Sequence, residues 1–140
     1  MNEKIKVSRF KQLKKVLVVD DERLTRDVAS KVLNRYLGCD VYTASNGGDA
    51  LDLLDSHTFD LLIADLAMPG ISGVELIKTV RVIKPNTCIM VVTGNANESD
   101  IKDVNDAGIN QVIYKPFKIS DLVEKVKNIL EKKEQVTNFA

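Results

Sequence analysis

The chain has 140 residues, of which 44% are hydrophobic and 29% are charged, a composition typical of a folded globular protein rather than a disordered one. This length is sufficient for one domain with its own core. No apolar run approaches the ~20 residues of a membrane span, and the start of the chain lacks a signal-peptide core, so a cytoplasmic location is expected.

The formal net charge is zero, but the charges are unevenly distributed. Residues 1–15 carry six basic side chains and one acidic side chain, which gives this segment a charge of +5 and the rest of the chain −5. A basic segment this short is too small to be a DNA-binding domain. We therefore interpret residues 1–15 as a solvated basic extension, and we expect neither direct nucleic-acid contact nor membrane contact.

The first predicted strand, residues 16–19, is a continuous apolar run of the kind buried on both faces of a parallel sheet. Three acidic residues, 20–22, follow it directly. Apolar residues then recur every three or four positions over residues 23–37, which predicts an amphipathic helix that ends at Gly38. A second short strand is expected over residues 41–44.

A turn over residues 45–48 leads to a second helix that includes residues 50–54. The third strand, residues 61–64, is again apolar throughout and is followed by Asp65. A proline and a glycine shortly afterwards turn the chain away from the sheet. The Asp65 carboxylate is therefore expected at the edge of a crevice.

A third helix is predicted from about Gly73 to the break at Pro85. Its apolar residues follow the helical period, so one face should pack on the sheet. The residues expected to face inward are Val74, Ile77, Val80 and either Ile83 or Val82.

The fourth strand, residues 88–93, ends in the polar residue Thr93. The fourth helix is expected over residues 98–107, and its only large apolar residues are Ile101 and Val104. Because so little apolar surface is available for burial, this helix should dock loosely.

The fifth strand, residues 112–114, is closed by Lys115. The last helix should begin near Ser120 and end by about residue 133. We therefore expect one domain over residues 16–133, between the basic extension and a C-terminal tail at residues 134–140.

Five strands that alternate with five helices, without hairpin signals, predict a parallel sheet covered on both faces. The expected fold is a three-layer, flavodoxin-like, doubly wound (βα)5 arrangement with strand order 2-1-3-4-5. Its switch point lies between strands 1 and 3. That topology places Asp20, Asp21 and Asp65 in one crevice, with Thr93 and Lys115 arriving from strands 4 and 5.

Three ionised carboxylates in one small site raise one another's pKa unless a cation lies between them. An all-oxygen site of this kind suits Mg²⁺. A lysine in the same crevice, Lys115, makes sense if an anion also binds, and phosphate suits a metal, a hydroxyl and an ammonium together. Since the crevice offers no thiol, histidine or activated serine, the expected nucleophile is a carboxylate, and Asp65 is the candidate.

These motifs resemble the receiver domain of two-component response regulators, and the resemblance covers about residues 16–133. Each motif alone is common, but five in the right order and spacing are highly specific. The matching segments are Val16 to Glu22, Asp65 with Met68, Pro69 and Gly73, Thr93-Gly94, and Lys115-Pro116-Phe117.

The resemblance implies that Asp65 accepts a phosphoryl group from a sensor histidine kinase, a histidine phosphotransfer protein or a small acyl phosphate. It implies that Mg²⁺ is bound by Asp21, Asp65 and the backbone carbonyl of Ala67, with Asp20 acting mostly through water. The protein would then catalyse only its own phosphorylation and dephosphorylation.

The resemblance also implies that Thr93 moves to bond the phosphoryl group while Lys115 pairs with its oxygens, and that the bond before Pro116 is cis. The face formed by helix 4, strand 5 and helix 5 would then change. That face would meet a downstream effector protein, an output domain outside these residues, or a second copy in a dimer formed on phosphorylation.

One position departs from the family pattern. Members commonly carry Tyr or Phe three residues before the lysine, where this chain has Val112. Tyr114 lies two residues further along and should point to the same side of the strand. Tyr114 or another group replaces the missing aromatic residue, or the coupling runs through backbone shifts alone. The alternative role for Tyr114 is packing only.

Two other functions are compatible with the residues. One is a pseudo-receiver, a binding module that kept the fold without phosphorylation. The other is a phosphatase with Asp65 as the nucleophile. Such enzymes usually need a second acid two residues after the nucleophile, and that position is Ala67 here.

Overall fold

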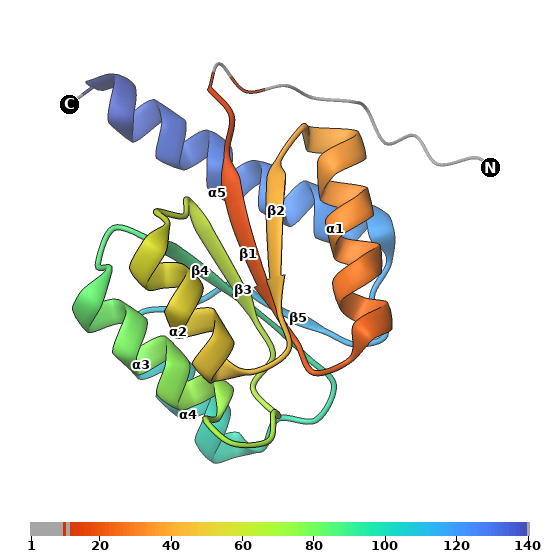
Figure 1. Cartoon of the computed structure of the whole chain (residues 1–140), viewed down its shortest axis with the longest axis vertical. Coiled ribbons are helices and arrows are strands. Elements are labelled where there is room, and N and C mark those ends of the chain that lie inside the picture. Colours follow the sequence, from red (N-terminus) through yellow and green to blue (C-terminus); the bar gives the residue numbers. More distant parts are fainter. Residues whose placement is uncertain (1–9, 11, 140) are drawn as a thin grey trace.

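The structure, a computed structural model, describes residues 10 and 12–139, with the side chains of 136–139 left out. Most of the predicted basic extension therefore lies outside the described residues. Strands and helices alternate along the chain (Figure 1). Their bounds are β1 Lys15–Val19, α1 Arg23–Leu37, β2 Asp40–Ala44, α2 Gly47–Ser56, β3 Leu61–Ala64, α3 Gly73–Ile83, β4 Cys88–Thr93, α4 Glu98–Asp106, β5 Val112–Tyr114 and α5 Ile119–Phe139.

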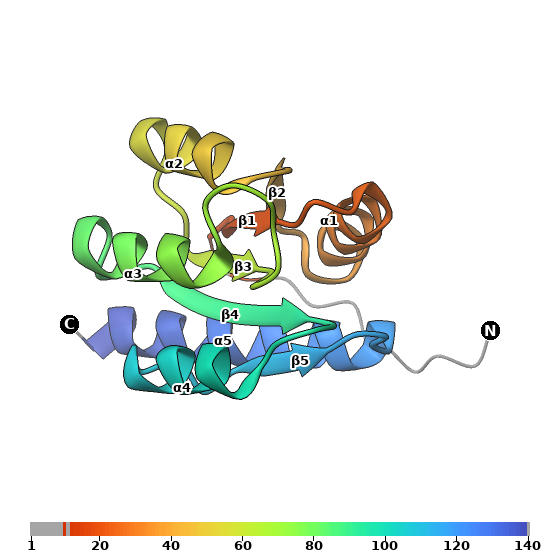
Figure 2. The ribbon, with the colours of Figure 1, turned by 90° about the horizontal axis from the view of Figure 1, so that it is seen from below.

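The five strands form one parallel sheet in the order β2-β1-β3-β4-β5, which confirms the predicted topology. Figure 1 shows α2, α3 and α4 on one side of the sheet and α1 and α5 on the other. Figure 2 shows the same sheet between its two helix layers from below. The fold is therefore the expected three-layer, doubly wound arrangement.

The core is divided between the two faces of the sheet because side chains alternate along each strand. Leu17, Leu62 and Val91 face the α2–α4 layer. Val18 and Ile63 face the layer of α1 and α5. All four residues of β3 are buried, as expected for the central strand of a parallel sheet.

The inward face of α3 differs from the prediction at its end. Val82 is 80% exposed and Ile83 is 49% exposed, so neither belongs to the core. Leu76, which was not expected inside, is fully buried. The physical reason is the helical period, since the buried stripe follows positions 73, 76, 77 and 80 and Ile83 is already the last residue of the helix.

The last helix also differs from the prediction, because α5 continues to Phe139 instead of ending by residue 133. Residues 134–139 thus extend the helix and do not form a separate tail. No glycine or proline follows Ile119 in this segment, so nothing in the sequence terminates the helix. At about 1.5 Å per residue, the 21 residues of α5 reach well beyond the strands of the sheet.

The first strand also begins one residue earlier than predicted. Lys15, which we had placed in the extension, is the first residue of β1, and Lys14 is buried. No helix among the described residues is long and apolar enough to cross a membrane.

Candidate functional site

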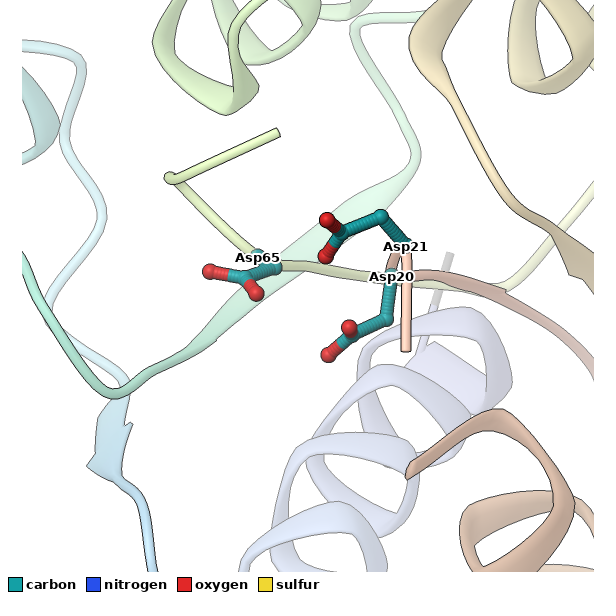
Figure 3. Close-up of side chains that lie close together, drawn as sticks. All are labelled: Asp20, Asp21 and Asp65. Atoms are coloured by element: carbon teal, nitrogen blue, oxygen red, sulfur yellow. The ribbon is translucent and has the colours of Figure 1, made fainter. Parts of the chain in front are cut away.

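The acidic residues that follow β1 and β3 meet at the carboxyl end of the sheet (Figure 3). The sheet's hydrogen bonds continue into both positions. The backbone N–H of Asp20 donates to Ala44 O at 3.1 Å, and that of Asp65 donates to Val19 O at 3.0 Å. Strand pairing therefore fixes the backbone of both aspartates.

The three predicted aspartates form one cluster, as the topology required. One carboxylate oxygen from each of Asp20, Asp21 and Asp65 lies within 4.8 Å of the others. Asp20 and Asp65 are buried, whereas Asp21 is exposed. The cluster is thus open to solvent on one side only.

The loop after Asp65 is held tightly against the start of α3. The backbone N–H of Ala67 donates to Asp65 Oδ1 at 3.1 Å, and the N–H of Gly73 donates to Leu66 O at 3.1 Å. A side chain at position 73 would collide with the backbone of Asp65 and Leu66. Gly73 is therefore needed for close approach, which allows α3 to begin directly beside the site.

The Lys115 ammonium contacts three carboxylates. Its Nζ lies 2.7 Å from Asp20 Oδ2, 3.1 Å from Asp65 Oδ2 and 2.8 Å from Glu22 Oε1. The first two contacts agree with the predicted convergence on one crevice. Glu22 was not among the predicted site residues, although its place as the third acid after the first strand was a signal that could have included it.

The site's electrostatics follow from burial and from these contacts. Burial raises the pKa of Asp20 above its ordinary value, and the Lys115 hydrogen bond only partly opposes this. Burial alone would lower the pKa of Lys115, but its hydrogen bonds to Asp20, Glu22 and Asp65 outweigh that effect and raise it. Lys115 is therefore charged at neutral pH.

The Thr93 hydroxyl lies at the end of β4 and is fully buried. Among the described residues, Thr93 Oγ1 is the buried side-chain oxygen without a hydrogen-bond partner. A buried hydroxyl without a partner costs on the order of 1–3 kcal/mol. Such a group beside a charged crevice is suited to receive a ligand.

The donor set fits a divalent cation. The acidic side chains of Asp20, Asp21, Glu22 and Asp65 outnumber the Lys115 ammonium that contacts three of them, so acidic groups are in excess. Carboxylate oxygens at this spacing are suitable ligands for Mg²⁺, which binds through few protein donors and retains several waters. The cluster therefore satisfies the chemical requirement for the predicted metal.

The end of β5 connects the site to the surface. The Lys115–Pro116 bond is cis, as the resemblance implied. Val112 is half-buried against the α2–α4 layer, whereas Tyr114 is 58% exposed. The strand register pairs Tyr114 with Thr93, so the two residues are neighbours across the β4–β5 pair.

A family model described as the response regulator receiver domain matches residues 16–127. The chemotaxis protein CheY of Pseudomonas aeruginosa is 32% identical over 120 residues, which cover 84% of this chain and 97% of that protein. The transcription factor SKN7 of Saccharomyces cerevisiae is 34% identical over 107 residues, but these cover 76% of this chain and only 17% of SKN7.

Solved structures agree with the sequence matches. A CheY-like response regulator receiver domain protein from Methanospirillum hungatei superposes with a TM-score of 0.84 at 30% identity, covering 89% of this chain and 98% of that one. The similarity therefore extends over most of the chain. The chain belongs to the response regulator receiver domain family.

Proposed function

We propose that this protein is a phosphorylation-dependent signalling switch of a two-component phosphorelay, with Asp65 as the phosphoacceptor. The observation that carries the proposal is the 3.1 Å contact between the Lys115 ammonium and the buried Asp65 carboxylate. A cation placed directly on a buried carboxylate stabilises charge where a phosphoryl group would be attached.

In the proposed step, a carboxylate oxygen of Asp65 attacks the phosphorus of a phosphohistidine. A new P–O bond forms as the P–N bond breaks, and the electron pair stays on the imidazole nitrogen, which takes up a proton. With a small acyl phosphate, the bond that breaks is the donor's P–O bond, and the donor's carboxylate leaves. The donor supplies the energy, so the protein's role is to position and stabilise charge.

Asp20, Asp21, Asp65 and the carbonyl of Ala67 are the groups that would hold Mg²⁺. The bound ion would neutralise charge shared by Asp65 and the phosphoryl oxygens. The site's own residues contribute in two ways. Asp20 and Lys115 keep the crevice ordered, and the Ala67 N–H fixes the rotamer of Asp65 at 3.1 Å.

The proposed switch begins at Thr93 and Lys115. A phosphoryl group carries about 1.5 to 2 negative charges, in place of the single charge of the Asp65 carboxylate, and three strong acceptor oxygens. The buried Thr93 hydroxyl, which lacks a partner, gains one by bonding to it. That movement would displace the end of β4 and the weakly packed α4, which changes the surface formed by α4, β5 and α5.

Tyr114 is the proposed reporter of this movement in place of the aromatic residue absent at Val112. Its register beside Thr93 and its exposure support that role. The cis bond before Pro116 leads directly from this strand into the loop before α5. Tyr114 would then carry the change at Thr93 to a protein partner.

The proposed upstream partner is a sensor histidine kinase or a histidine phosphotransfer protein. The proposed downstream partner is an effector protein, an output domain or, through the α4–β5–α5 surface, a second copy of this chain. The matches support either arrangement, because the aligned region is nearly all of CheY but only a small part of SKN7. A cytoplasmic location remains a prediction.

Incubation with acetyl phosphate and Mg²⁺, followed by intact-mass measurement, tests the acceptor. The wild type should gain the mass of one phosphoryl group, and Asp65→Asn should gain none. Asp60→Asn is a matched control, because Asp60 precedes β3 at the opposite end of the strand. Its phosphorylation should equal that of the wild type.

The outcomes separate the three functions. A wild type that never gains the mass rejects the switch and favours the pseudo-receiver. Steady hydrolysis of phosphate esters without accumulation of phosphoprotein would favour the phosphatase. Phosphorylation of the wild type alone supports the proposed function.

Tyr114→Ala tests the proposed reporter. We expect phosphorylation to shift the backbone amide signals of α4 less in this variant than in the wild type. Val82→Ala, which truncates another exposed apolar residue, should leave the response unchanged. An unaltered α4 response in Tyr114→Ala would remove Tyr114 from the switch.

A further inference from the structure

The third carboxylate on Lys115 differs from the other two. The side chains of Asp20 and Asp65 are 3% and 6% exposed, whereas that of Glu22 is 61% exposed. Yet its 2.8 Å contact is nearly as short as that of Asp20. Glu22 is therefore a surface residue whose carboxylate contacts Lys115, which lies 93 positions away in the sequence.

The position of Glu22 in its own helix does not explain this conformation. Glu22 is the N-cap residue of α1, but its side chain makes no capping hydrogen bond. The preferred N-cap residues are Ser, Thr, Asp and Asn, whose shorter side chains reach the helix's free N–H groups. The carboxylate of Glu22 is instead directed across the crevice, to the loop that follows β5.

A lysine ammonium has three N–H donors and no acceptor. Asp20, Glu22 and Asp65 supply one acceptor oxygen each, so together they match the number of donors. A phosphoryl group on Asp65 would bring further acceptor oxygens to the same ammonium, and about two negative charges in place of the single charge of the carboxylate. It would therefore compete with the carboxylates already bound there.

Glu22 is the partner that is easiest to displace. Water can solvate its carboxylate on release, because the side chain is largely exposed. Asp20 is buried and would be left as a charge without its partner, which is far more costly. Repulsion between the arriving phosphoryl oxygens and the Glu22 carboxylate acts in the same direction.

We propose that Glu22 is a place-holding carboxylate, which occupies Lys115 in the unphosphorylated protein and is displaced when Asp65 carries a phosphoryl group. This role rests on the proposed function. Glu22 thereby sets how strongly the site holds the phosphoryl group, and its release frees the last residue of the β1–α1 connection. It is a positioning residue for Lys115.

Beryllium fluoride, a phosphoryl mimic, tests the competition for Lys115 without a phosphoryl-transfer step. The full chain is titrated with it in saturating Mg²⁺, and the Gly94 amide signal reports binding. We expect Glu22→Gln and Glu22→Ala to bind the mimic about two- to fivefold more tightly than the wild type, the size of one exposed ion pair. Both variants should fold, since the side chain is exposed.

Two comparisons separate competition for Lys115 from a general loss of negative charge. Glu75→Gln removes an exposed carboxylate from the first turn of α3, at the same end of the sheet, and should leave the affinity nearly unchanged. In a Lys115→Met background, Glu22→Gln should bring no gain, because the shared partner is absent.

Each outcome is decisive. Unchanged affinity in both Glu22 variants, an equal gain in Glu75→Gln, or a gain that persists in Lys115→Met rejects the place-holding role and leaves the proposed function intact. A wild type that does not bind beryllium fluoride rejects the proposed function and the role of Glu22 together.

Discussion

Helices α3 and α4 cover the same face of the sheet, but they are attached to it very differently. Five residues of α3 are buried, including Leu76 and Ile77, whereas only Val104 is buried in α4. The start of α3 is also fixed by the close approach of Gly73 to the Asp65 loop. The reacting carboxylate therefore lies beside a firmly anchored helix, and the neighbouring helix is free to respond.

This difference separates positioning from signalling. A phosphoacceptor needs fixed geometry, because small displacements of reacting groups are costly to the rate. A switch needs an element whose alternative arrangement is close in free energy, and such elements come from the weakly packed part of a structure. The two requirements are met by adjacent helices.

The largest expected effect comes from a glycine substitution at the start of α3. Gly73→Ala places a methyl group against the backbone of Asp65 and Leu66, which cannot move without disturbing β3. We expect a loss of about 3 kcal/mol or more in the free energy of unfolding, at the upper end of overpacking effects. Urea unfolding monitored by circular dichroism measures it.

Gly108→Ala is the matched substitution beyond α4. Gly108 has φ of +80°, and a Cβ there would meet no atom within 4 Å. Its cost should be limited to the left-handed backbone conformation, about 1–2 kcal/mol. If Gly108→Ala destabilised the protein as much as Gly73→Ala does, the close approach of Gly73 would not explain a firmer attachment of α3 than of α4.

Truncation of one buried valine in each helix gives the next largest effect. Val80 in α3 and Val104 in α4 are 0% and 1% exposed. Val80→Ala should cost about 2–3 kcal/mol, the range for losing a buried aliphatic contact. Val104→Ala should cost about 1 kcal/mol globally, because α4 can relax around the missing methyl groups.

Amide hydrogen exchange distinguishes global from local effects of these two substitutions. Val104→Ala should speed exchange in α4 alone, whereas Val80→Ala should speed it in α3 and the sheet together. Equal global losses, with exchange increased across the whole domain in both variants, would show that α4 is as firmly docked as α3.

A smaller effect tests the electrostatic cost of burying the Asp20 carboxylate in the site. Burial raises the pKa of Asp20 above its ordinary 3.8, so the folded protein binds a proton there more readily than the unfolded chain. The stability contributed by this group therefore falls as pH rises from 3.8 through the folded pKa. Ionised Asp20 destabilises the folded state at neutral pH.

Asp20→Asn should accordingly stabilise the protein at pH 7, by roughly 0.5–2 kcal/mol, and the gain should shrink as pH falls toward 4. Lys115 keeps two carboxylate partners, Glu22 and Asp65, in this variant. Urea unfolding at several pH values measures the difference. Asp21→Asn, at the exposed neighbour, is the control and should change stability less; a loss of stability in Asp20→Asn at pH 7 would contradict the argument.

The parts of the structure that the sequence predicted are those governed by local periodicity. The bounds of α1, β4 and β5 agree with the apolar patterns, and the strand order follows from general rules of chain crossover. The cluster of Asp20, Asp21 and Asp65 followed in turn, because the carboxyl ends of neighbouring parallel strands share one edge.

The parts that the sequence did not predict depend on contacts between distant segments or on where a helix leaves the sheet. The contact of Glu22 with Lys115 joins two loops 93 residues apart, and no periodicity describes it. The exposure of Ile83 depends on where α3 ends. The continuation of α5 to Phe139 is different, because the absence of glycine and proline after Ile119 was a sequence signal for it.

The smallest expected effect concerns the one ion pair between the two helices among the described residues. Lys78 Nζ of α3 lies 3.9 Å from Asp103 Oδ2 of α4, and the two side chains are 60% and 39% exposed. Pairs of this kind contribute about 0.2–1 kcal/mol. Lys78→Ala should change global stability little, but it should speed amide exchange in α4 about twofold. The reason is that α4 docks weakly, so even a small contact is a sizeable share of the free energy that holds it on the domain.

A control with the same N–O distance is available within α5, where Lys127 Nζ lies 3.9 Å from Glu131 Oε1. Lys127→Ala should leave exchange in α4 unchanged. The difference between the two variants should also disappear at about 1 M salt, where charges are screened within ~3 Å. Unchanged exchange in Lys78→Ala would mean that α4 is held by Val104 and its half-buried neighbours alone. Movement of α4 would then be controlled from β4 and Thr93, without a contribution from α3.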